Sequence, residues 1–303
     1  MRVMISRYAP APTGFLHLGH IVNAIYVWGF TKARDGRVLL RIEDHDRQRS
    51  RPAFEAAIVE DLEWLGFRAD GPMMRQSERG DIYSQALDTL RARGLVYACA
   101  CSRTEILSSI AARSFEGREA RGPERPALRT NDDELWYPGT CRDRGLREGP
   151  GVGLRVRLEP TVERFVDLRH GPQEQQPSEQ CGDLLVRDRD GNWTYQFAAT
   201  VDDYVQGVTH VIRGDDLLPS TGRQIQLARL LGRIEPPAFL HHPLIMKSPT
   251  QKLSKSDGDT GVRELRAKGW SPERVIGRAA ALAGLTDCET DMSAVDVSNL
   301  FTC

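Results

Sequence analysis

The sequence predicts an α/β fold built on a parallel sheet, and three observations indicate it. A β-prone run at 2–8, a helical pattern at 18–34 and an apolar run at 38–42 form a strand–helix–strand unit. A further apolar run at 208–213 is followed by a helical pattern at 219–232. Strands that alternate with helices pair in parallel through right-handed crossovers. The 303 residues, 40% of them hydrophobic, are enough for two domains or one large one.

The elements of the first hundred residues have clear boundaries. Two prolines and a glycine within 10–14 end the first strand. Apolar residues recur through 18–34 at the spacing of a helix that is buried on a broad face, and an Asp-Gly pair at 35–36 ends it. Further helical patterns occupy 52–65 and 79–93.

The middle of the chain predicts a different kind of structure. The segment 96–141 contains a long polar stretch rich in Arg and Glu, which indicates an insertion that is partly loop. Short strands follow, and an Asp-Gly pair at 190–191 predicts a hairpin turn between the last two. We expect these strands at 153–158, 163–168, 183–187 and 192–197. A helical pattern returns at 272–284, and the last fifteen residues are weakly patterned.

Composition excludes several classes of protein. No stretch of about 18 apolar residues occurs, so a membrane span is excluded. The start of the chain lacks the apolar core of a secretory signal, and we therefore expect a cytoplasmic protein. Six cysteines in 303 residues are too few for a disulfide scaffold.

The charged residues are balanced in sign but uneven in type. The chain has 41 basic and 42 acidic residues, and its net charge of −1 argues, taken alone, against a nucleic-acid binder. Only five of the 41 basic residues are lysines, and two of these, Lys252 and Lys255, lie within the five-residue segment Lys-Leu-Ser-Lys-Ser. A chain that uses arginine almost everywhere thus has a local requirement for lysine.

The tetrad His-Leu-Gly-His at 17–20 lies where the first strand and its turn enter a helix. Ligands of parallel sheets bind at the carboxyl ends of strands, and a helix N-terminus favours anions. His17 and His20 could both donate to one phosphate, and Gly19 leaves room for a flat base or a ribose. Taken alone, the tetrad is a weak signal, since two histidines near a helix start are more often surface groups.

The segment 252–256 suits a triphosphate. Two ammonium groups on a polar loop could neutralise the charge that develops as pyrophosphate leaves. The alternative is a solvated basic loop. The glycine-rich phosphate loop G-x-x-x-x-G-K-[ST] does not occur in this chain.

These two motifs in this order resemble the paired signatures of the class I aminoacyl-tRNA synthetases, H-I-G-H and K-M-S-K-S. Three further segments resemble the glutamyl branch of that family: Arg-Tyr-Ala-Pro-Ala-Pro-Thr-Gly at 7–14, Arg-Ile-Glu-Asp at 41–44 and the stretch 207–216. The resemblance implies a Rossmann-type catalytic domain with a parallel sheet. It also implies that His17, Gly19, His20 and Lys255 bind ATP, and that His17, His20, Lys252 and Lys255 are catalytic, with Mg²⁺ accompanying ATP.

The same segments supply a charge pattern that fits free glutamate, which carries two carboxylates and one ammonium group. Arginine can bind both oxygens of a carboxylate. Arg7 is the expected partner of the side-chain carboxylate and Glu43 of the ammonium group, while Tyr195 could add a hydroxyl donor. The resemblance places the glutamate site at Arg7, Tyr8, Ala9, Pro10, Ala11, Glu43, Tyr195 and Arg213.

Ala11 departs from the family, which usually has serine at this position. A missing neutral hydrogen bond costs on the order of 0.5–1.5 kcal/mol, which would weaken glutamate binding without abolishing it.

Cysteines in the insertion suggest one structural zinc ion. Cys99, Cys101 and Cys141 offer three soft ligands, whereas a structural zinc site has four. The resemblance implies Tyr137 as the fourth ligand, although tyrosine is uncommon because its pKa near 10 must fall on binding. His170 is the alternative, and three buried thiols without metal are a further one.

After Ser256 only 47 residues follow in this sequence, too few for the anticodon-binding domains of a full glutamyl enzyme. This plan, and the segments 182–186 and 197–203, resemble a shortened subgroup that transfers glutamate to the queuosine base of tRNA(Asp). The alternatives are a truncated enzyme that charges a tRNA 3′ end, and a non-catalytic RNA-binding relative.

The expected organisation follows from this resemblance. We expect the first half of the nucleotide-binding domain at 1–98 and a zinc-binding insertion at 99–150. The second half of the nucleotide-binding domain, with strands like those that bind a tRNA acceptor end, is expected at 151–235. The loop that carries Lys-Leu-Ser-Lys-Ser, called the lysine loop below, is expected with a short helical part at 236–303. We expect no anticodon-binding domain, and a monomer that uses ATP, L-glutamate and tRNA(Asp) containing queuosine.

Overall fold

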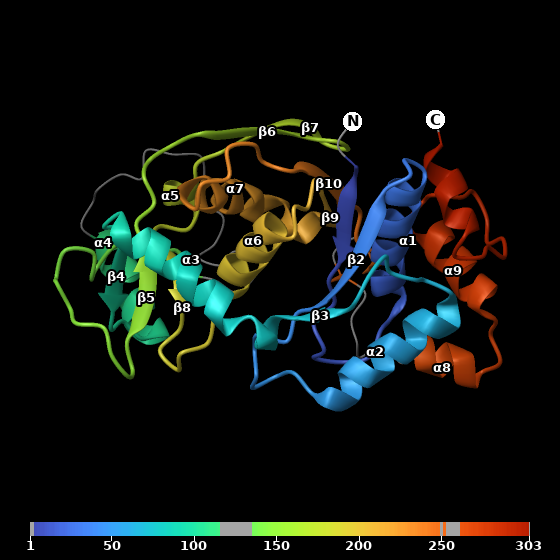
Figure 1. The fold of residues 1–303 in the computed structure, drawn as a ribbon, viewed down its shortest axis with the longest axis horizontal. Helices are drawn as coiled ribbons and strands as arrows, with labels where there is room; N and C mark the ends of the chain where they lie inside the picture. Colours follow the sequence, from blue (N-terminus) through green and yellow to red (C-terminus); the bar gives the residue numbers. More distant parts are fainter. Residues whose placement is uncertain (1–2, 116–134, 249–250, 253–260, 303) are drawn as a thin grey trace.

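The structure is a computed structural model that describes residues 3–115, 135–248, 251–252 and 261–302 (Figure 1). Its strands are β1 (Ile5–Tyr8), β2 (Arg37–Ile42), β3 (Met74–Arg75), β4 (Val96–Cys99), β5 (Gly153–Val156), β6 (Glu163–Asp167), β7 (Gly171–Gln175), β8 (Leu184–Arg187), β9 (His210–Gly214), β10 (Ala238–His242), β11 (Met246–Ser248) and β12 (Gln251–Lys252). Its α-helices are α1 (Leu18–Lys32), α2 (Pro52–Leu65), α3 (Gly80–Ala92), α4 (Arg103–Phe115), α5 (Pro177–Gln180), α6 (Tyr195–Val205), α7 (Thr221–Leu230), α8 (Val262–Ala267) and α9 (Pro272–Leu282). The 3₁₀-helices are η1 (Gln76–Glu78), η2 (Asp215–Ser220) and η3 (Asp296–Phe301).

Two parallel strand groups from distant parts of the chain form the centre of the molecule. β1, β2 and β3 pair in parallel, and so do β9 and β10, with β6 next to β10. The start of β1 joins the second group, because Thr209 N donates to Ile5 O over 2.9 Å. The carboxyl ends of β1 and β9 therefore meet at one edge, which confirms the predicted α/β class with a parallel sheet.

Helix α1 packs between these strands and the C-terminal part of the chain (Figure 1). The buried apolar face predicted from the sequence is present, and the Asp-Gly pair follows the end of the helix as expected. On its other side, η3 lies so close that a Cβ atom on Gly29 would come within 2.4 Å of the Phe301 ring. The weakly patterned C-terminus thus belongs to the core around α1.

A second body lies beyond the parallel strands. β4, β5 and β8 form an antiparallel sheet whose apolar face packs with α3 and α6. Figure 1 shows this sheet with α4 at the end of the molecule opposite to α8 and α9.

One predicted strand is wrong. The segment 192–197 contributes only a bridge between Trp193 and Arg187 after the Asp-Gly turn, and α6 then begins at Tyr195. The alternation of large residues suited a strand, but the same aromatic side chains serve the start of a helix, where Trp193 stacks on Phe197 with ring centroids 5.3 Å apart. Tertiary packing therefore decided between two periods that the short run allowed.

Other elements differ from the prediction in extent. β7 and β10 were not predicted, and β10 contains two histidines that hide its strand character. α4 occupies the first part of the stretch 102–136, of which residues 116–134 lie outside the described residues. The predicted helix at 219–232 begins instead as the 3₁₀-helix η2, which contains Pro219. None of the described helices is long and apolar enough to cross a membrane.

Candidate active site

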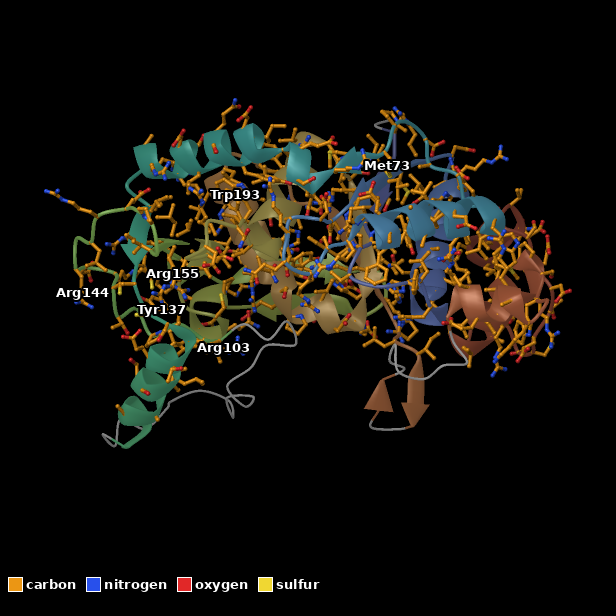
Figure 2. The ribbon with its side chains drawn as sticks, turned by 90° about the horizontal axis from the view of Figure 1, so that it is seen from below. Met73, Arg103, Tyr137, Arg144, Arg155 and Trp193 are labelled. Carbon is orange, nitrogen blue, oxygen red and sulfur yellow. The ribbon has the colours of Figure 1, made fainter. Side chains whose placement is uncertain are left out.

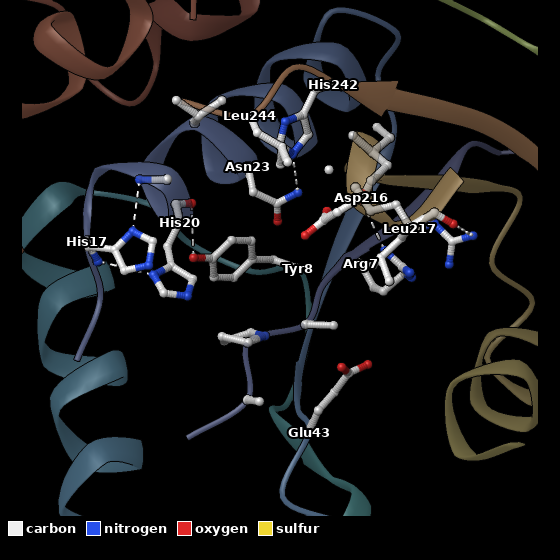
Figure 3. A pocket seen from close by; sticks show the side chains of 18 of the residues that line it. Arg7, Tyr8, His17, His20, Asn23, Glu43, Asp216, Leu217, His242 and Leu244 are labelled. Carbon is white, nitrogen blue, oxygen red and sulfur yellow. Dashed lines mark hydrogen bonds between the residues drawn. The ribbon is translucent and has the colours of Figure 1, made fainter. Parts of the chain in front are cut away.

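A cavity of about 490 Å³ opens at the carboxyl ends of β1, β2, β9 and β10, beside the N-terminus of α1 (Figure 3). Eleven of the predicted site residues line it, from segments up to 206 positions apart: Arg7, Tyr8, Ala9, Pro10, Ala11, His17, Gly19, His20, Glu43, Tyr195 and Arg213. Its wall also contains residues that sequence reasoning missed, among them Asn23, His45, Asp216, His242 and Leu244. The resemblance to a known family was the signal that found the first set.

The two histidines of the tetrad cap α1 through their own rings. The Nδ1 atom of His17 accepts from Gly19 N over 3.1 Å, and the Nδ1 atom of His20 accepts from His17 N over 3.1 Å. Because a neutral imidazole carries one proton, both rings must carry it on Nε2. The cap therefore fixes the N–H of each histidine on Nε2, which is the tautomer suited to a phosphate oxygen.

Gly19 is required in this arrangement. A Cβ atom at this position would lie 2.9 Å from Cε1 of His17, so any larger residue would displace the capping ring. The lack of a side chain at Gly19 also leaves the backbone at the start of α1 open toward the cavity.

The predicted lysine loop is only partly described. Lys252 lies in β12, whose backbone pairs with β11, and Lys255 lies outside the described residues. Where the described chain resumes, Gly261 forms a bridge with His17, and Val262 N donates to Leu16 O over 3.0 Å. The end of the loop is therefore anchored at the histidine tetrad.

The predicted glutamate ligands Arg7 and Glu43 belong to one buried charge network. Asp203 Oδ1 accepts from Arg7 Nε over 3.0 Å and from Arg41 over 2.6 Å, and Arg41 donates to Glu43 over 3.0 Å. Burial alone would raise the pKa of Asp203, but the charges of Arg7 and Arg41 outweigh it and lower that pKa. Asp203 stays ionised and holds the two guanidinium groups in place.

The backbone also positions Glu43. Its amide donates to the carbonyl oxygen of Pro10 over 3.0 Å, which ties the end of β2 to the segment after β1. Arg41 is completely buried and lies 3.9 Å from Asp202, which in turn accepts hydrogen bonds from Gln76 and Tyr83. Neither Arg41, Asp202 nor Asp203 was predicted as a site residue.

Arg213 is held by a second buried chain of hydrogen bonds, the Asp167–His241–Arg213 relay. Its Nε donates to His241 Nε2 over 3.0 Å, and His241 Nδ1 lies 2.7 Å from Asp167. Burial and the neighbouring Arg213 lower the pKa of His241 to about 3, so the ring is neutral with its proton on Nδ1. Thr221 and Gln224 accept from the other two nitrogens of the guanidinium group, over 2.9 and 2.6 Å.

The three predicted thiol ligands meet in the insertion. The sulfur atoms of Cys99, Cys101 and Cys141 all lie within 4.8 Å of one another, and the hydroxyl of Tyr137 is 3.3 Å from Cys99 Sγ and 4.0 Å from Cys101 Sγ. A tetrahedral zinc ion at roughly 2.3 Å from each sulfur separates its ligands by about 3.8 Å, so the four groups fit it.

The position of Tyr137 favours this residue over His170 as the fourth ligand of a metal at the thiol cluster. Cys141 N donates to its hydroxyl oxygen over 2.8 Å, and the Arg155 guanidinium lies 3.6 Å from its ring centroid, in the region labelled in Figure 2. The Cys141 amide favours negative charge on the phenol oxygen, whereas burial and the neighbouring Cys99 raise the pKa of Tyr137. His170 instead bonds Asp215 over 2.7 Å and is not part of the thiol group.

The fold and the pocket define a class I synthetase catalytic domain, and the comparisons with known proteins agree. The family described as "tRNA synthetases class I (E and Q), catalytic domain" matches residues 3–299, and the chain belongs to this family. A Bordetella bronchiseptica protein named glutamyl-Q tRNA(Asp) synthetase is 46% identical over 84% of this chain and 75% of its own length. A Rhodobacter capsulatus protein of the same name is 41% identical over 90% of this chain and 100% of its own length.

A solved structure also resembles the chain along nearly its whole length. It is the crystal structure of a glutamate tRNA ligase from Elizabethkingia meningosepticum in complex with its amino acid, with a TM-score of 0.77 and 30% identity. The match covers 98% of this chain and 64% of the ligase, so the chain spans less than two thirds of that structure.

Proposed function

We propose that the protein activates L-glutamate with ATP and transfers the glutamyl group to the queuosine base in the anticodon loop of tRNA(Asp). The pocket carries this proposal, because one cavity combines a capped helix start with two Nε2 donors and a buried Arg7–Asp203–Arg41–Glu43 network. Relatives that bear the name glutamyl-Q tRNA(Asp) synthetase are 41–46% identical to this chain.

Glutamate is selected by charge. Arg7, oriented by Asp203, binds the side-chain carboxylate, and Glu43, oriented by Arg41, binds the α-ammonium group. Arg213 adds positive charge from the end of β9, and Tyr195 lines the same cavity. Because each charged group is already buried and hydrogen-bonded, the site is preorganised before the substrate enters.

The first step is an in-line displacement at the α-phosphorus of ATP. An oxygen of the glutamate α-carboxylate forms a bond to this phosphorus, the bond to the bridging oxygen breaks, and pyrophosphate leaves. His17 and His20 donate from Nε2 to the α-phosphate, while Lys252 and Lys255 stabilise the departing charge. Mg²⁺ bound with ATP would neutralise further phosphate charge.

The second step transfers the glutamyl group. A hydroxyl group of queuosine attacks the adenylate carbonyl carbon and loses its proton to solvent, the bond between this carbon and the phosphate oxygen breaks, and AMP leaves. The protein supplies positioning rather than a nucleophile.

The thiol cluster has a structural role in this proposal. Cys99, Cys101, Cys141 and Tyr137 would hold one Zn²⁺, which links β4 to the far end of the insertion. Along with this metal, the monomeric state, the cytoplasmic location and the four-segment organisation stay predictions.

Two assays test the proposed function. Glutamate-dependent exchange of pyrophosphate into ATP measures activation without tRNA, and acylation is then compared between tRNA(Asp) with and without queuosine. We expect exchange, and labelling of the queuosine-containing tRNA alone. Labelling of a tRNA(Glu) 3′ end would instead select the truncated glutamyl enzyme, and no exchange by zinc-loaded protein would select the non-catalytic relative.

A further inference from the structure

A polar pair, Asn23 and His242, lies in the wall of the cavity and has no part in the glutamate network. Asn23 is on α1, one helical turn beyond Gly19, and His242 is the last residue of β10. The side-chain Nδ2 of Asn23 lies 2.9 Å from Nε2 of His242. Two distant segments therefore place a specific polar contact beside the helix start.

The ring of His242 has a defined protonation state. Its Nδ1 lies 3.0 Å from the carbonyl oxygen of Pro243, which can only accept, so Nδ1 carries the proton. Burial lowers the pKa of this histidine, which keeps the ring neutral and leaves Nε2 as an acceptor. Tyr26 stacks on the ring with centroids 4.9 Å apart and fixes its plane.

This state determines how the Asn23 amide is turned. Since His242 Nε2 accepts, Asn23 must offer its Nδ2, and its Oδ1 is left as an acceptor. Figure 3 shows this oxygen directed into the same part of the cavity as the Asp216 carboxylate. Within the described residues, no other hydrogen bond involves the Asn23 side chain.

The position along α1 indicates which ligand group would meet this oxygen. The phosphates belong at the start of α1, and Asn23 lies four residues beyond Gly19, which is about 6 Å or roughly one turn further along the helix. Leu244 and Ile245 line the cavity from the segment after β10 and suit the flat face of a base. The part of a nucleotide between its phosphates and its base is the sugar, whose hydroxyl groups are donors.

We propose that Asn23, oriented by His242, accepts a hydrogen bond from a ribose hydroxyl of the nucleotide and so selects ribonucleotides. This inference rests on the proposed function, because it takes ATP as the substrate. Asn23 is a specificity-determining residue that touches the ligand, and His242 is a positioning residue that acts through it.

Titration of ATP, 2′-deoxyATP and 3′-deoxyATP onto the whole protein tests this proposal. In the wild type, the analogue that lacks the contacted hydroxyl should bind about 3- to 10-fold more weakly than ATP, the range expected for one hydrogen bond. Asn23→Ala should weaken the binding of ATP to the level of that analogue and so remove the discrimination between the two nucleotides. The KM for glutamate in pyrophosphate exchange should stay within twofold.

His242 is tested by a pair of variants. His242→Leu removes the acceptor that turns the amide, and should reduce the discrimination about as much as Asn23→Ala does. His242→Gln places an amide oxygen near the former Nε2 position and should therefore keep the discrimination between ATP and the deoxy analogue. If the role of His242 were purely structural, this difference between the Leu and Gln variants would not be expected. Thermal unfolding of each variant confirms that it folds.

Three results would overturn the inference. The first is unchanged discrimination between ATP and the deoxy analogues in Asn23→Ala. The second is a rise in the KM for glutamate instead of the KM for ATP. The third requires a further titration with an ATP analogue that lacks the 6-amino group, and it is a loss in Asn23→Ala of discrimination against that analogue alone. A wild type that binds ATP with ribose selectivity but shows no exchange would refute the proposed function and leave this inference standing.

Discussion

The buried carboxylate of Asp203 offers the sharpest test of the glutamate site. Asp203→Asn removes the negative charge that Arg7 and Arg41 share, over 3.0 and 2.6 Å. Arg41 keeps Glu43 at 3.0 Å, so the loss falls mainly on Arg7. Breaking a buried ion pair from one side costs about 3–5 kcal/mol, because an uncompensated charge stays buried. We expect the free energy of unfolding to fall by about 3 kcal/mol.

Function should change with stability in this variant. A misplaced Arg7 loses its charge-assisted contact with the substrate side chain, and such contacts contribute about 1.5–3 kcal/mol. The KM for glutamate in pyrophosphate exchange should therefore rise at least about tenfold, while the KM for ATP stays near its original value. Urea unfolding and exchange kinetics on the same preparation measure both effects.

Glu163→Gln is a matched control. Glu163 is a buried carboxylate that binds Arg229 over 2.6 and 2.8 Å and does not line the cavity. This variant should lose stability without any change in the KM for glutamate. Equal KM values in Asp203→Asn and Glu163→Gln would refute the argument that Asp203 orients a glutamate ligand.

The pH dependence gives an independent check. The folded-state pKa of Asp203 is lowered by Arg7 and Arg41 despite its burial, so its contribution to stability is present above the unfolded pKa of about 3.9. That contribution is lost as pH falls through the folded-state pKa. The difference in unfolding free energy between wild type and Asp203→Asn should therefore be constant near neutral pH and shrink in strong acid.

The remaining predictions concern four other parts of the molecule. Lys255→Ala should lower glutamate-dependent pyrophosphate exchange about tenfold or more, and exchange at the wild-type rate would remove the role proposed for this lysine. Ala11→Ser should lower the KM for glutamate up to about tenfold if the added hydroxyl reaches the substrate, and an unchanged KM would show that it does not. The pKa of His241 is lowered to about 3, so the wild type loses stability as pH falls from about 6.5 toward 3, and His241→Gln should flatten this slope in urea unfolding. Cys141→Ala should abolish stoichiometric zinc in metal analysis while Cys181→Ala retains it, and equal zinc contents would refute the thiol site.

Much of the fold could be predicted because its signals are local. The helical period at 18–34, the Asp-Gly pair after it and the apolar runs on either side indicate a strand–helix–strand unit within about 40 residues. The strand predicted at 192–197 was wrong because a run of six residues fits both periods, and only the packing of Trp193 on Phe197 selects the helix.

The candidate site divides in the same way. The two signature motifs, together with Arg7, Glu43 and Arg213, were found because short motifs resemble a known family. Six of these residues line one cavity: Arg7, His17, Gly19, His20, Glu43 and Arg213. Arg41 and Asp203 lie in the segments 41–44 and 197–203 that resemble the family, but they were not assigned to the site, since no local pattern shows that an aspartate pairs with an arginine 196 residues away.

The sequence by itself determined the α/β class, the family and most of the residue types that line the cavity, since these depend on local periods and short motifs. Only the tertiary structure decided how those residues are held. The Asp203 bridge, the Asp167–His241–Arg213 relay and the orientation of Asn23 by His242 each join segments far apart in the chain. Buried polar groups need partners, and which partner each one finds is decided by the packing that brings distant segments together.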